Sequence, residues 1–342
     1  MILVKLRQWS KPFDKGLLKL VEIDNENGFK VILINLGAGI HRIYKDDKLM
    51  NVSPLHVTGY FDCSPMYGKT IGRYAGRIED GKFKLNDKDY QLDLNNGGNC
   101  LHGGKECIGD KIFDVEVKDL IDHVEVIFTL HDEENLFPGN VDFKVVYTIT
   151  NNSSLYIDYY AKSDKDTIMN ITNHTYFNLN GDPHKICDNH ALKINASRYT
   201  NLKENMCLRK IEDVNKIMDF RNKHMIKDYY DDESIQNHPT KGYDHCYLLD
   251  NHSLEDCVAE LTCVESGYTL KVYTTYPCVV LYTYNYPDGK LIYPSIKPKK
   301  MHGVCLECQY MPNSINKCKE TVLKANKEYH HEIIFSFEKE EN

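Results

Sequence analysis

The feature that most constrains this chain is a short-range alternation of apolar and polar residues, interrupted again and again by turn residues. Its clearest case is the pair of runs 143–149 and 155–161, joined by the polar residues 151–154. Apolar side chains occupy every second position in both runs, which places them on one face of a strand. Two such runs joined by a few turn residues predict an antiparallel hairpin.

The same signal recurs along the chain. It predicts hairpins for 18–23 with 29–35, 83–85 with 90–94, 115–117 with 123–130 and 258–264 with 269–275, and a last strand at 332–337. Helical periodicity is scarce, at 214–218 and in a short turn near 314–317. Many short strands with almost no long helix predict an all-β sandwich or barrel.

No linker, repeat or low-complexity tract divides the chain, so we expect a single domain over residues 1–342. The more polar segment 211–241 is expected to be a long surface excursion. The longest uncharged run, 272–287, is rich in Tyr and Thr and contains Pro277. We interpret it as a strand pair and not as a membrane span.

Composition narrows the possible functions. A hydrophobic content of 42% is enough for a sizeable core, and a net charge of -8 with interspersed signs argues against a nucleic-acid partner. The N-terminus becomes charged too early for a signal peptide, so the twelve cysteines are expected to be reduced thiols of a cytoplasmic protein. Cys305, Cys308 and Cys318 lack a second ligand pair at zinc-finger spacing, so we expect no metal there.

One stretch, 170–181, departs from the strand pattern. It places His174 among four asparagines, two aromatic residues and a glycine. Asn is depleted in strands and Gly weakens them, so this polarity predicts side chains that reach a ligand. His174 is therefore the first candidate for a functional residue.

Four other segments depart in a similar way. They hold Arg73 and Arg77 in 71–78, His102 in 95–104, Asp244 and His245 before the strand 246–249, and Glu307 in 303–309. Most have an ordinary alternative: arginines on strands make surface ion pairs, a histidine in a glycine-rich turn is often a turn residue, and an aspartate before a strand often caps it. Glu307 is harder to explain in this way, because a charge in an apolar strand must face solvent, a partner or a ligand.

Taken together, these motifs resemble the aldose 1-epimerase (galactose mutarotase) family, in its order and at similar spacing. The matching motifs are Arg73-Tyr-Ala-Gly-Arg77, Leu101-His-Gly-Gly104, Thr172-Asn-His-Thr-Tyr-Phe-Asn-Leu179, Tyr243-Asp-His245 and Glu307-Cys-Gln-Tyr-Met-Pro-Asn313. The resemblance runs from about Leu18 to the last strand. It implies a large single-domain antiparallel β-sandwich (the galactose mutarotase-like supersandwich), no cofactor, and interconversion of the α and β anomers of free hexoses such as galactose and glucose.

The resemblance also implies roles for individual residues. Glu307 would be the general base, His174 the general acid, and His102 would assist near the ring oxygen. The substrate-binding residues would be Arg77, Asp244 and Asn173, and no metal would be needed. Mutarotation removes a proton from the C1 hydroxyl and delivers another to the ring oxygen, which a carboxylate and a histidine can do together. An apolar strand should raise the pKa of the carboxyl group.

Three residues depart from the family pattern: Gly76, Val280 and Asn313 stand where Asn, Gln and Asp are common. The segment 285–301 is longer than usual and could cover part of the site. Two alternatives stay open. One is a hexose-phosphate mutarotase, for which Arg73 and Lys105 are the nearby cations, and the other is a non-catalytic sugar-binding or regulatory protein on the same fold. We expect a monomer or weak dimer with a small-molecule hexose substrate and no membrane partner.

Overall fold

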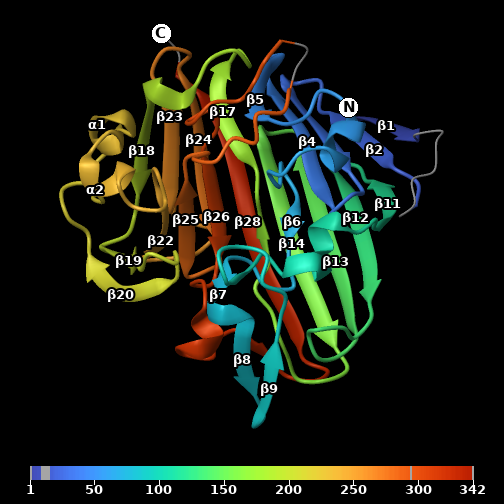
Figure 1. The fold of residues 1–342 in the computed structure, drawn as a ribbon. Helices are drawn as coiled ribbons and strands as arrows, with labels where there is room; N and C mark the ends of the chain where they lie inside the picture. Colours follow the sequence, from blue (N-terminus) through green and yellow to red (C-terminus); the bar gives the residue numbers. More distant parts are fainter. Residues whose placement is uncertain (1, 9–15, 293–294, 341–342) are drawn as a thin grey trace.

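The chain forms two facing β-layers in the computed structural model, which describes residues 2–8, 16–292 and 295–340 (Figure 1). The first layer is a nine-stranded sheet whose neighbouring strands are all antiparallel. In spatial order its strands are β11 (Asp114–Asp119), β12 (His123–Asp132), β13 (Val141–Thr150), β14 (Ser154–Ser163), β28 (Glu328–Lys339), β24 (Tyr268–Thr274), β23 (Ala259–Cys263), β18 (His190–Ile194) and β21 (His224–Met225).

The second layer consists of a six-stranded and a five-stranded sheet. The six strands are β1 (Leu3–Gln8), β2 (Lys19–Asp24), β3 (Phe29–Ile34), β4 (Gly39–Lys45), β5 (Lys48–Val52) and β17 (Tyr176–Gly181). The five are β20 (Leu208–Asp213), β19 (Arg198–Leu202), β22 (Asp244–Leu248), β25 (Cys278–Tyr282) and β26 (Cys305–Gln309). Reciprocal backbone hydrogen bonds between Phe177 and Val304, of 2.8 and 2.9 Å, join β17 to the residue before β26. The two sheets therefore form one continuous layer.

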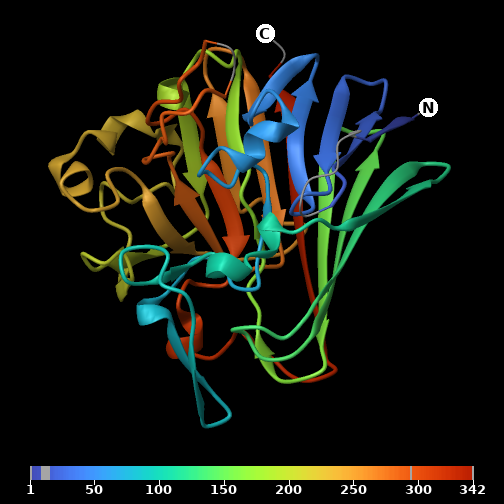
Figure 2. The same cartoon turned by 45° about the vertical axis from the view of Figure 1, so that its right-hand side comes forward.

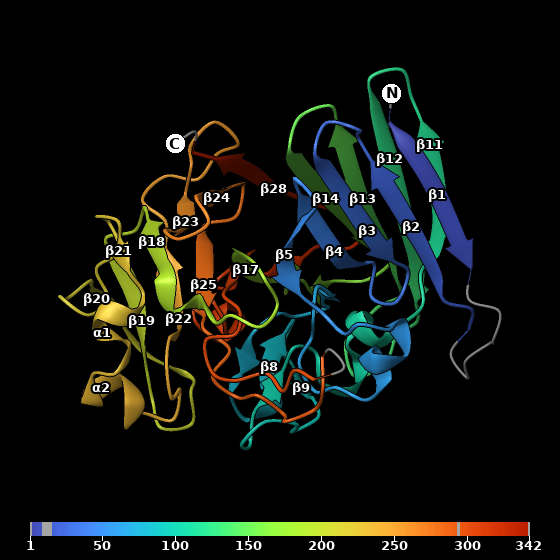
Figure 3. The same ribbon diagram turned by 90° about the horizontal axis from the view of Figure 1, so that it is seen from above.

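Strand alternation explains why the layers stack. Along β13, Phe143 and Val145 are buried while Asp142 and Lys144 are exposed. The buried faces of all three sheets contribute to one hydrophobic cluster. Figure 3 shows the N-terminal strands β1 to β4 facing β11 to β14 across this core. Two sheets that pack face to face in this way form a β-sandwich, as the sequence predicts.

Short elements connect the sheets. The short strand pairs are β6 (Thr70–Ile71) with β16 (Thr172–Asn173), β7 (Arg77–Ile78) with β10 (Cys100–Leu101), β8 (Lys82–Leu85) with β9 (Lys88–Gln91), and β15 (Thr167–Ile168) with β27 (Val322–Leu323). The helical turns are η1 (Val57–Phe61), η2 (Glu79–Gly81), η3 (Gly104–Glu106), η4 (Ile108–Asp110), η5 (Cys187–Asn189), η6 (Ser314–Asn316), α1 (Lys227–Tyr230) and α2 (Glu233–Gln236). The β8–β9 hairpin projects from the end of the sandwich (Figure 2). Within the described part of the chain, no helix is both long and apolar enough to cross a membrane.

All five predicted hairpins are confirmed, as are the final strand and the turn at η6. The predicted helix at 214–218 is wrong. The Asn215 side-chain oxygen accepts hydrogen bonds from the backbone N–H groups of Ile217 and Met218, at 3.0 and 3.2 Å. An asparagine bonded to the backbone in this way stabilises a turn in place of a helix.

Two further expectations need correction. Segment 211–241 is not a free excursion, because Phe220, Ile226 and Tyr230 are buried in the core cluster and β21 extends the nine-stranded sheet. The run 272–287 supplies two strands that do not pair with each other. β24 pairs with β23 and β28 in one layer, whereas β25 pairs with β22 and β26 in the other. The short link around Pro277 therefore carries the chain from one layer to the other.

Candidate active site

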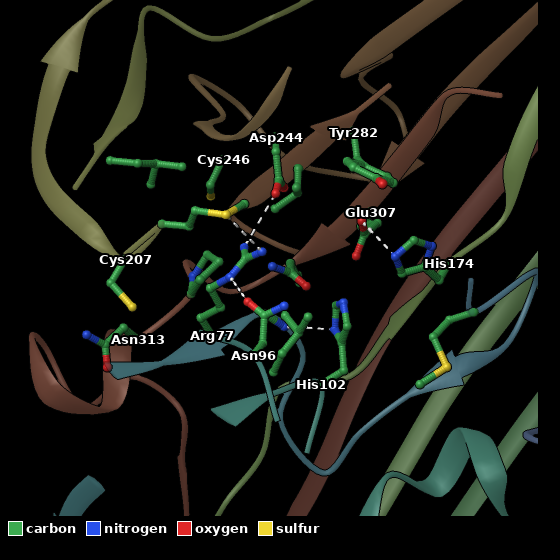
Figure 4. Close-up of a pocket in the computed structure, with 18 of the residues that line it drawn as sticks. Arg77, Asn96, His102, His174, Cys207, Asp244, Cys246, Tyr282, Glu307 and Asn313 are labelled. Atoms are coloured by element: carbon green, nitrogen blue, oxygen red, sulfur yellow. Dashed lines mark hydrogen bonds and ion pairs between the residues drawn. The ribbon is translucent and has the colours of Figure 1, made fainter. Parts of the chain in front are cut away.

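A cavity of about 450 Å³ lies on the face of the five-stranded sheet that points away from the core. Its lining combines residues of β19, β22, β25 and β26 with residues from the motif segments near β7, β10 and β16. Five of the six predicted site residues line it: Arg77, His102, His174, Asp244 and Glu307. Figure 4 shows these five side chains pointing toward one another from different segments. The fold thus brings together residues that lie far apart in the sequence.

Glu307 reaches the cavity because of the strand register. It lies directly opposite Val280 on β25, which lies opposite Cys246 on β22. Directly opposed residues in antiparallel strands project from the same face, so these three side chains form one row across the cavity floor. Asp244 and Tyr282 begin the adjacent row. Strand alternation alone therefore fixes which residues form the floor.

His174 lies in the link between β16 and β17. Its backbone N–H donates to the Lys69 carbonyl and its own carbonyl accepts from Gly68 N–H, both at 2.9 Å. The His174 ring packs against Tyr176, with ring centroids 4.9 Å apart, and edge-on to Tyr282 at 6.1 Å. Backbone bonds and aromatic contacts together hold this imidazole at the cavity wall.

The asparagines of 170–181 have a different role from the one the sequence suggests. Asn170 donates to the carbonyls of Ala75 and Tyr310 and accepts from Tyr310 N–H, so it ties three motif segments together. Asn178 donates to two backbone carbonyls. Buried amides whose hydrogen bonds go to backbone groups are structural. The expectation that this polarity reaches a ligand is therefore wrong except at His174 and Tyr176, which line the cavity.

Asn173 is the one predicted substrate-binding residue that the structure does not bring to the cavity. Its amide nitrogen donates to the Gly68 carbonyl at 3.1 Å, and its oxygen accepts from both the backbone and the hydroxyl of Thr175. The side chain is 1% exposed and does not line the cavity. Its bonds stabilise the turn that carries His174, so it supports the site indirectly.

His174 and Glu307 form the centre of the site. Nε2 of His174 lies 3.5 Å from Oε1 of Glu307, and both side chains are almost completely buried. Burial raises the pKa of Glu307 well above its usual value, with Asp244 adding to the rise and Arg77 opposing it. Burial also lowers the pKa of His174 to about 4. Both shifts favour the neutral forms, so besides the N–H of the neutral imidazole the pair holds one further proton, which either group can carry.

His102 stands beside this pair, with its ring 5.3 Å from that of His174 and nearly perpendicular to it. Burial lowers its pKa well below the usual value, and His174 and Arg77 lower it further. Its Nδ1 accepts the backbone N–H of Gly76 at 3.3 Å, which leaves the proton of the neutral ring on Nε2. The next residue must be glycine, because a Cβ on Gly103 would lie 2.8 Å from the Gly72 carbonyl oxygen.

Arg77 and Asp244 form an ion pair at the cavity wall, with Nη1 3.4 Å from Oδ2. Arg77 Nε also donates to the Asn96 side chain at 3.0 Å. Burial raises the pKa of Asp244, and Arg77 is the main group that opposes the rise. The pair offers both donors and acceptors, the combination that sugar hydroxyl groups require.

Several lining residues were not singled out from the sequence. Asn96 lies inside the glycine-rich segment around His102, so the motif could have indicated it. Tyr282 lies two residues from Val280 on β25 and shares its face, so strand alternation could have indicated it. Tyr286 comes from the segment 285–301, which therefore does reach the cavity; residues 293 and 294 of that segment lie outside the described residues. Met206 had no sequence signal and contacts Arg77 through its sulfur at 3.7 Å.

The departures from the family pattern have structural counterparts. Gly76, Val280 and Asn313 all line the cavity. Gly76 has a φ of +77°, and a Cβ there would lie 2.8 Å from two carbons of Pro312. A larger residue is therefore excluded unless Pro312 moves. Val280 adds to an apolar side of the cavity, together with Cys246 and Leu208.

The two cations suggested as phosphate contacts, Arg73 and Lys105, do not line the cavity. Arg73 is fully buried, pairs with Asp132 at 2.6 Å and donates to four backbone carbonyls. Lys105 lies on η3 and is not part of the cavity lining. The suggestion that Arg73 contacts a phosphate is therefore wrong, because all its donors are used inside the protein.

A metal ion is another use to consider for this cluster, since one ligand atom each of His102, His174 and Glu307 lie within 4.8 Å of one another. Two histidines and a glutamate can bind zinc. However, Nδ1 of His102 already accepts the Gly76 N–H, so Nε2 carries the proton. Neither nitrogen then offers a free lone pair, and the arrangement suits proton transfer better than metal binding.

Comparisons with known proteins agree with the resemblance seen in the motifs. Residues 19–336 match the family model described as aldose 1-epimerase. An aldose 1-epimerase of Haemophilus influenzae is 33% identical over 315 residues, which is 89% of each chain. A galactose mutarotase of Bos taurus is 30% identical over 95% of this chain and 96% of that protein. The crystal structure of a galactose 1-epimerase from Lactobacillus acidophilus superposes over all of both chains with a TM-score of 0.90 at 27% identity.

Proposed function

The chain belongs to the aldose 1-epimerase family, a family of isomerases, and we propose that it interconverts the α and β anomers of free hexoses such as galactose and glucose. The observation that carries this proposal is the His174–Glu307 pair, two buried titratable groups 3.5 Å apart at the wall of a cavity. No other pair of described cavity-lining residues combines a histidine and a carboxylate at this distance.

The proton count of the pair matches the reaction. When the shared proton moves from Glu307 to Nε2 of His174, the pair can accept a proton at the Glu307 carboxylate while it delivers one from Nε2. In the proposed step, Glu307 takes the proton of the C1 hydroxyl as His174 protonates the ring oxygen. The C1–O5 bond breaks, the aldehyde forms, the C1–C2 bond rotates, and the ring closes on the other face. The reverse transfers restore the pair, so no proton is gained or lost over the cycle.

The other cavity residues would hold the sugar during this cycle. His102 presents its Nε2 proton beside His174 and would donate to the oxygen that gains charge. Arg77 and Asp244 would bind hydroxyl groups on the part of the ring away from C1. Each well-placed acid or base contributes typically 10²–10⁴-fold to a rate. Such a contribution is sufficient for a reaction that already proceeds in water.

Polarimetry on freshly dissolved α-D-glucose and α-D-galactose tests the proposal. We expect the wild-type protein to accelerate the decay of rotation, and Glu307→Gln and His174→Asn each to lower kcat by roughly 10²–10⁴-fold. A wild-type rate equal to that of buffer would exclude the function. Sugar binding by calorimetry without any acceleration would instead establish the sugar-binding alternative.

We also propose that residues 1–342 form one domain, because the core cluster draws on strands from β2 to β28. A single cooperative unfolding transition seen by both circular dichroism and calorimetry supports this. Two separable transitions would contradict it.

A further inference from the structure

The His174 ring has a polar neighbour that the proposed reaction does not use. Sγ of Cys305 lies 3.5 Å from Nδ1 of His174, and both residues are buried. Cys305 is on β26, two residues before Glu307. Residues two apart on a strand share one face. A single strand therefore contacts both edges of the imidazole, with Cys305 at Nδ1 and Glu307 at Nε2.

We propose that Cys305 is a positioning residue for His174: its thiol binds Nδ1 and thereby keeps Nε2 directed at Glu307 and the substrate. The inference rests on the proposed function, because it assigns His174 as the acid. The aromatic contacts of Tyr176 and Tyr282 restrict the plane of the ring. They do not distinguish the ring from its 180° flip, which would put Cδ2 in the place of Nδ1 and Cε1 in the place of Nε2. Among the described residues, the side chain within hydrogen-bonding distance of Nδ1 is that of Cys305.

A thiol suits this position because it is neutral and bonds weakly. Burial raises the pKa of Cys305 well above its usual value, so the group stays a thiol. Its sulfur is a weak acceptor, so it can accept a hydrogen bond from the Nδ1–H group in both the neutral and the charged ring. A carboxylate there would stabilise the imidazolium and make His174 a weaker acid. The pKa of about 4 for His174 agrees with a partner that does not stabilise the charge.

The proton balance of the step follows from this arrangement. Burial raises the pKa of Glu307 and lowers that of His174, so the shared proton favours the carboxyl group, which lies 3.5 Å from Nε2. The proton of the neutral His174 then lies on Nδ1, at the Cys305 sulfur. Transfer to Nε2 gives the imidazolium, and donation to the ring oxygen returns the same neutral form. The Nδ1 proton stays on the sulfur side throughout. Cys305 exchanges no proton and makes no covalent bond.

Cys308 provides a matched control. It is a buried thiol on the same strand, but it lies in the core cluster and on the opposite face. Cys308→Ala therefore makes the same chemical change without touching His174. We expect Cys305→Ala to lower kcat roughly three- to tenfold with KM within about twofold of wild type. Cys305→Ser should have a kcat within about twofold of wild type, and so should Cys308→Ala.

A nitrogen-15 NMR measurement of the His174 ring tests the inference without turnover. In wild type and Cys305→Ser we expect the shifts of a single tautomer with the proton on Nδ1. In Cys305→Ala the two nitrogens should move toward each other as the forms mix. The inference is overturned if Cys305→Ala and Cys308→Ala behave alike, if Ser fails to restore what Ala loses, or if the His174 shifts are the same in wild type and Cys305→Ala. If the protein does not accelerate mutarotation but the His174 shifts still depend on Cys305, the proposed function is overturned and the positioning role of Cys305 is not.

Discussion

Two buried pairs in this protein each join a basic side chain to a carboxyl group, but the two pairs have different roles. Arg73 and Asp132 are 0% and 2% exposed and lie 2.6 Å apart, and His174 and Glu307 are 6% and 4% exposed and lie 3.5 Å apart. The arginine also donates to four carbonyls, and Lys111 contacts the second carboxylate oxygen. Neither group of the second pair has such a set of partners. A buried ion pair whose hydrogen bonds are complete is structural, whereas buried titratable groups that face a cavity and have few partners are available for proton transfer.

The largest expected effect is on stability. Asp132→Asn leaves the Arg73 guanidinium buried without its counter-ion, and breaking a buried pair in this way costs about 3–5 kcal/mol. Glu307→Gln removes a desolvated acid from the cavity and should change the free energy of unfolding by less than about 1 kcal/mol. Urea unfolding followed by circular dichroism measures both. The comparison fails if Glu307→Gln is the more destabilising of the two.

The second effect is on pH dependence. The pKa of His174 is lowered to about 4, so the pair gains a second proton only below about pH 4. We expect kcat/KM to fall tenfold per pH unit below about pH 4 and to be level above it until the alkaline limb begins. On the alkaline side, activity falls where Glu307 and His174 lose their shared proton, at a pH set by the raised pKa of Glu307. Polarimetry in a series of buffers, corrected for buffer catalysis, gives the profile.

The pH profile also separates the two pairs. In Asp132→Asn the acid limb of the folded enzyme should stay near pH 4, because this pair does not contact His174. In His174→Asn the limb should disappear from the residual activity. An acid limb near the ordinary histidine pKa of about 6.5 would mean that His174 is not the buried, neutral group described above.

The smallest effect concerns the apolar side of the cavity. Val280 lies directly across from Glu307, so Val280→Gln places an amide beside the reacting centre. One new hydrogen bond contributes about 0.5–1.5 kcal/mol, so KM for galactose should fall roughly two- to tenfold with kcat little changed. Val280→Leu keeps the wall apolar and is the control. Equal KM values for the two variants would show that this wall does not contact the sugar.

Much of the architecture could be predicted from local sequence. The hairpins at β2–β3, β13–β14 and β23–β24 follow from alternation and turn residues, because both strands of a hairpin are close in the chain. The placement of β24 and β25 in different layers could not be predicted, because a strand has the same alternation in either layer. The helix expected at 214–218 failed for a local reason, the bonds of the Asn215 side chain to the backbone.

The sequence by itself determined the motifs, their order and the chemistry of the candidate residues, since residue type sets what a side chain can donate or accept. Tertiary structure alone separated Arg73 from Arg77, two arginines of one motif. One lies inside the protein against Asp132, and the other lies on the cavity wall with Asp244. It also decided that Asn173 supports a turn and that Cys305 contacts His174. The reason is physical: a side chain's role depends on which partners complete its hydrogen bonds, and these come from strands that meet only when the sheets stack.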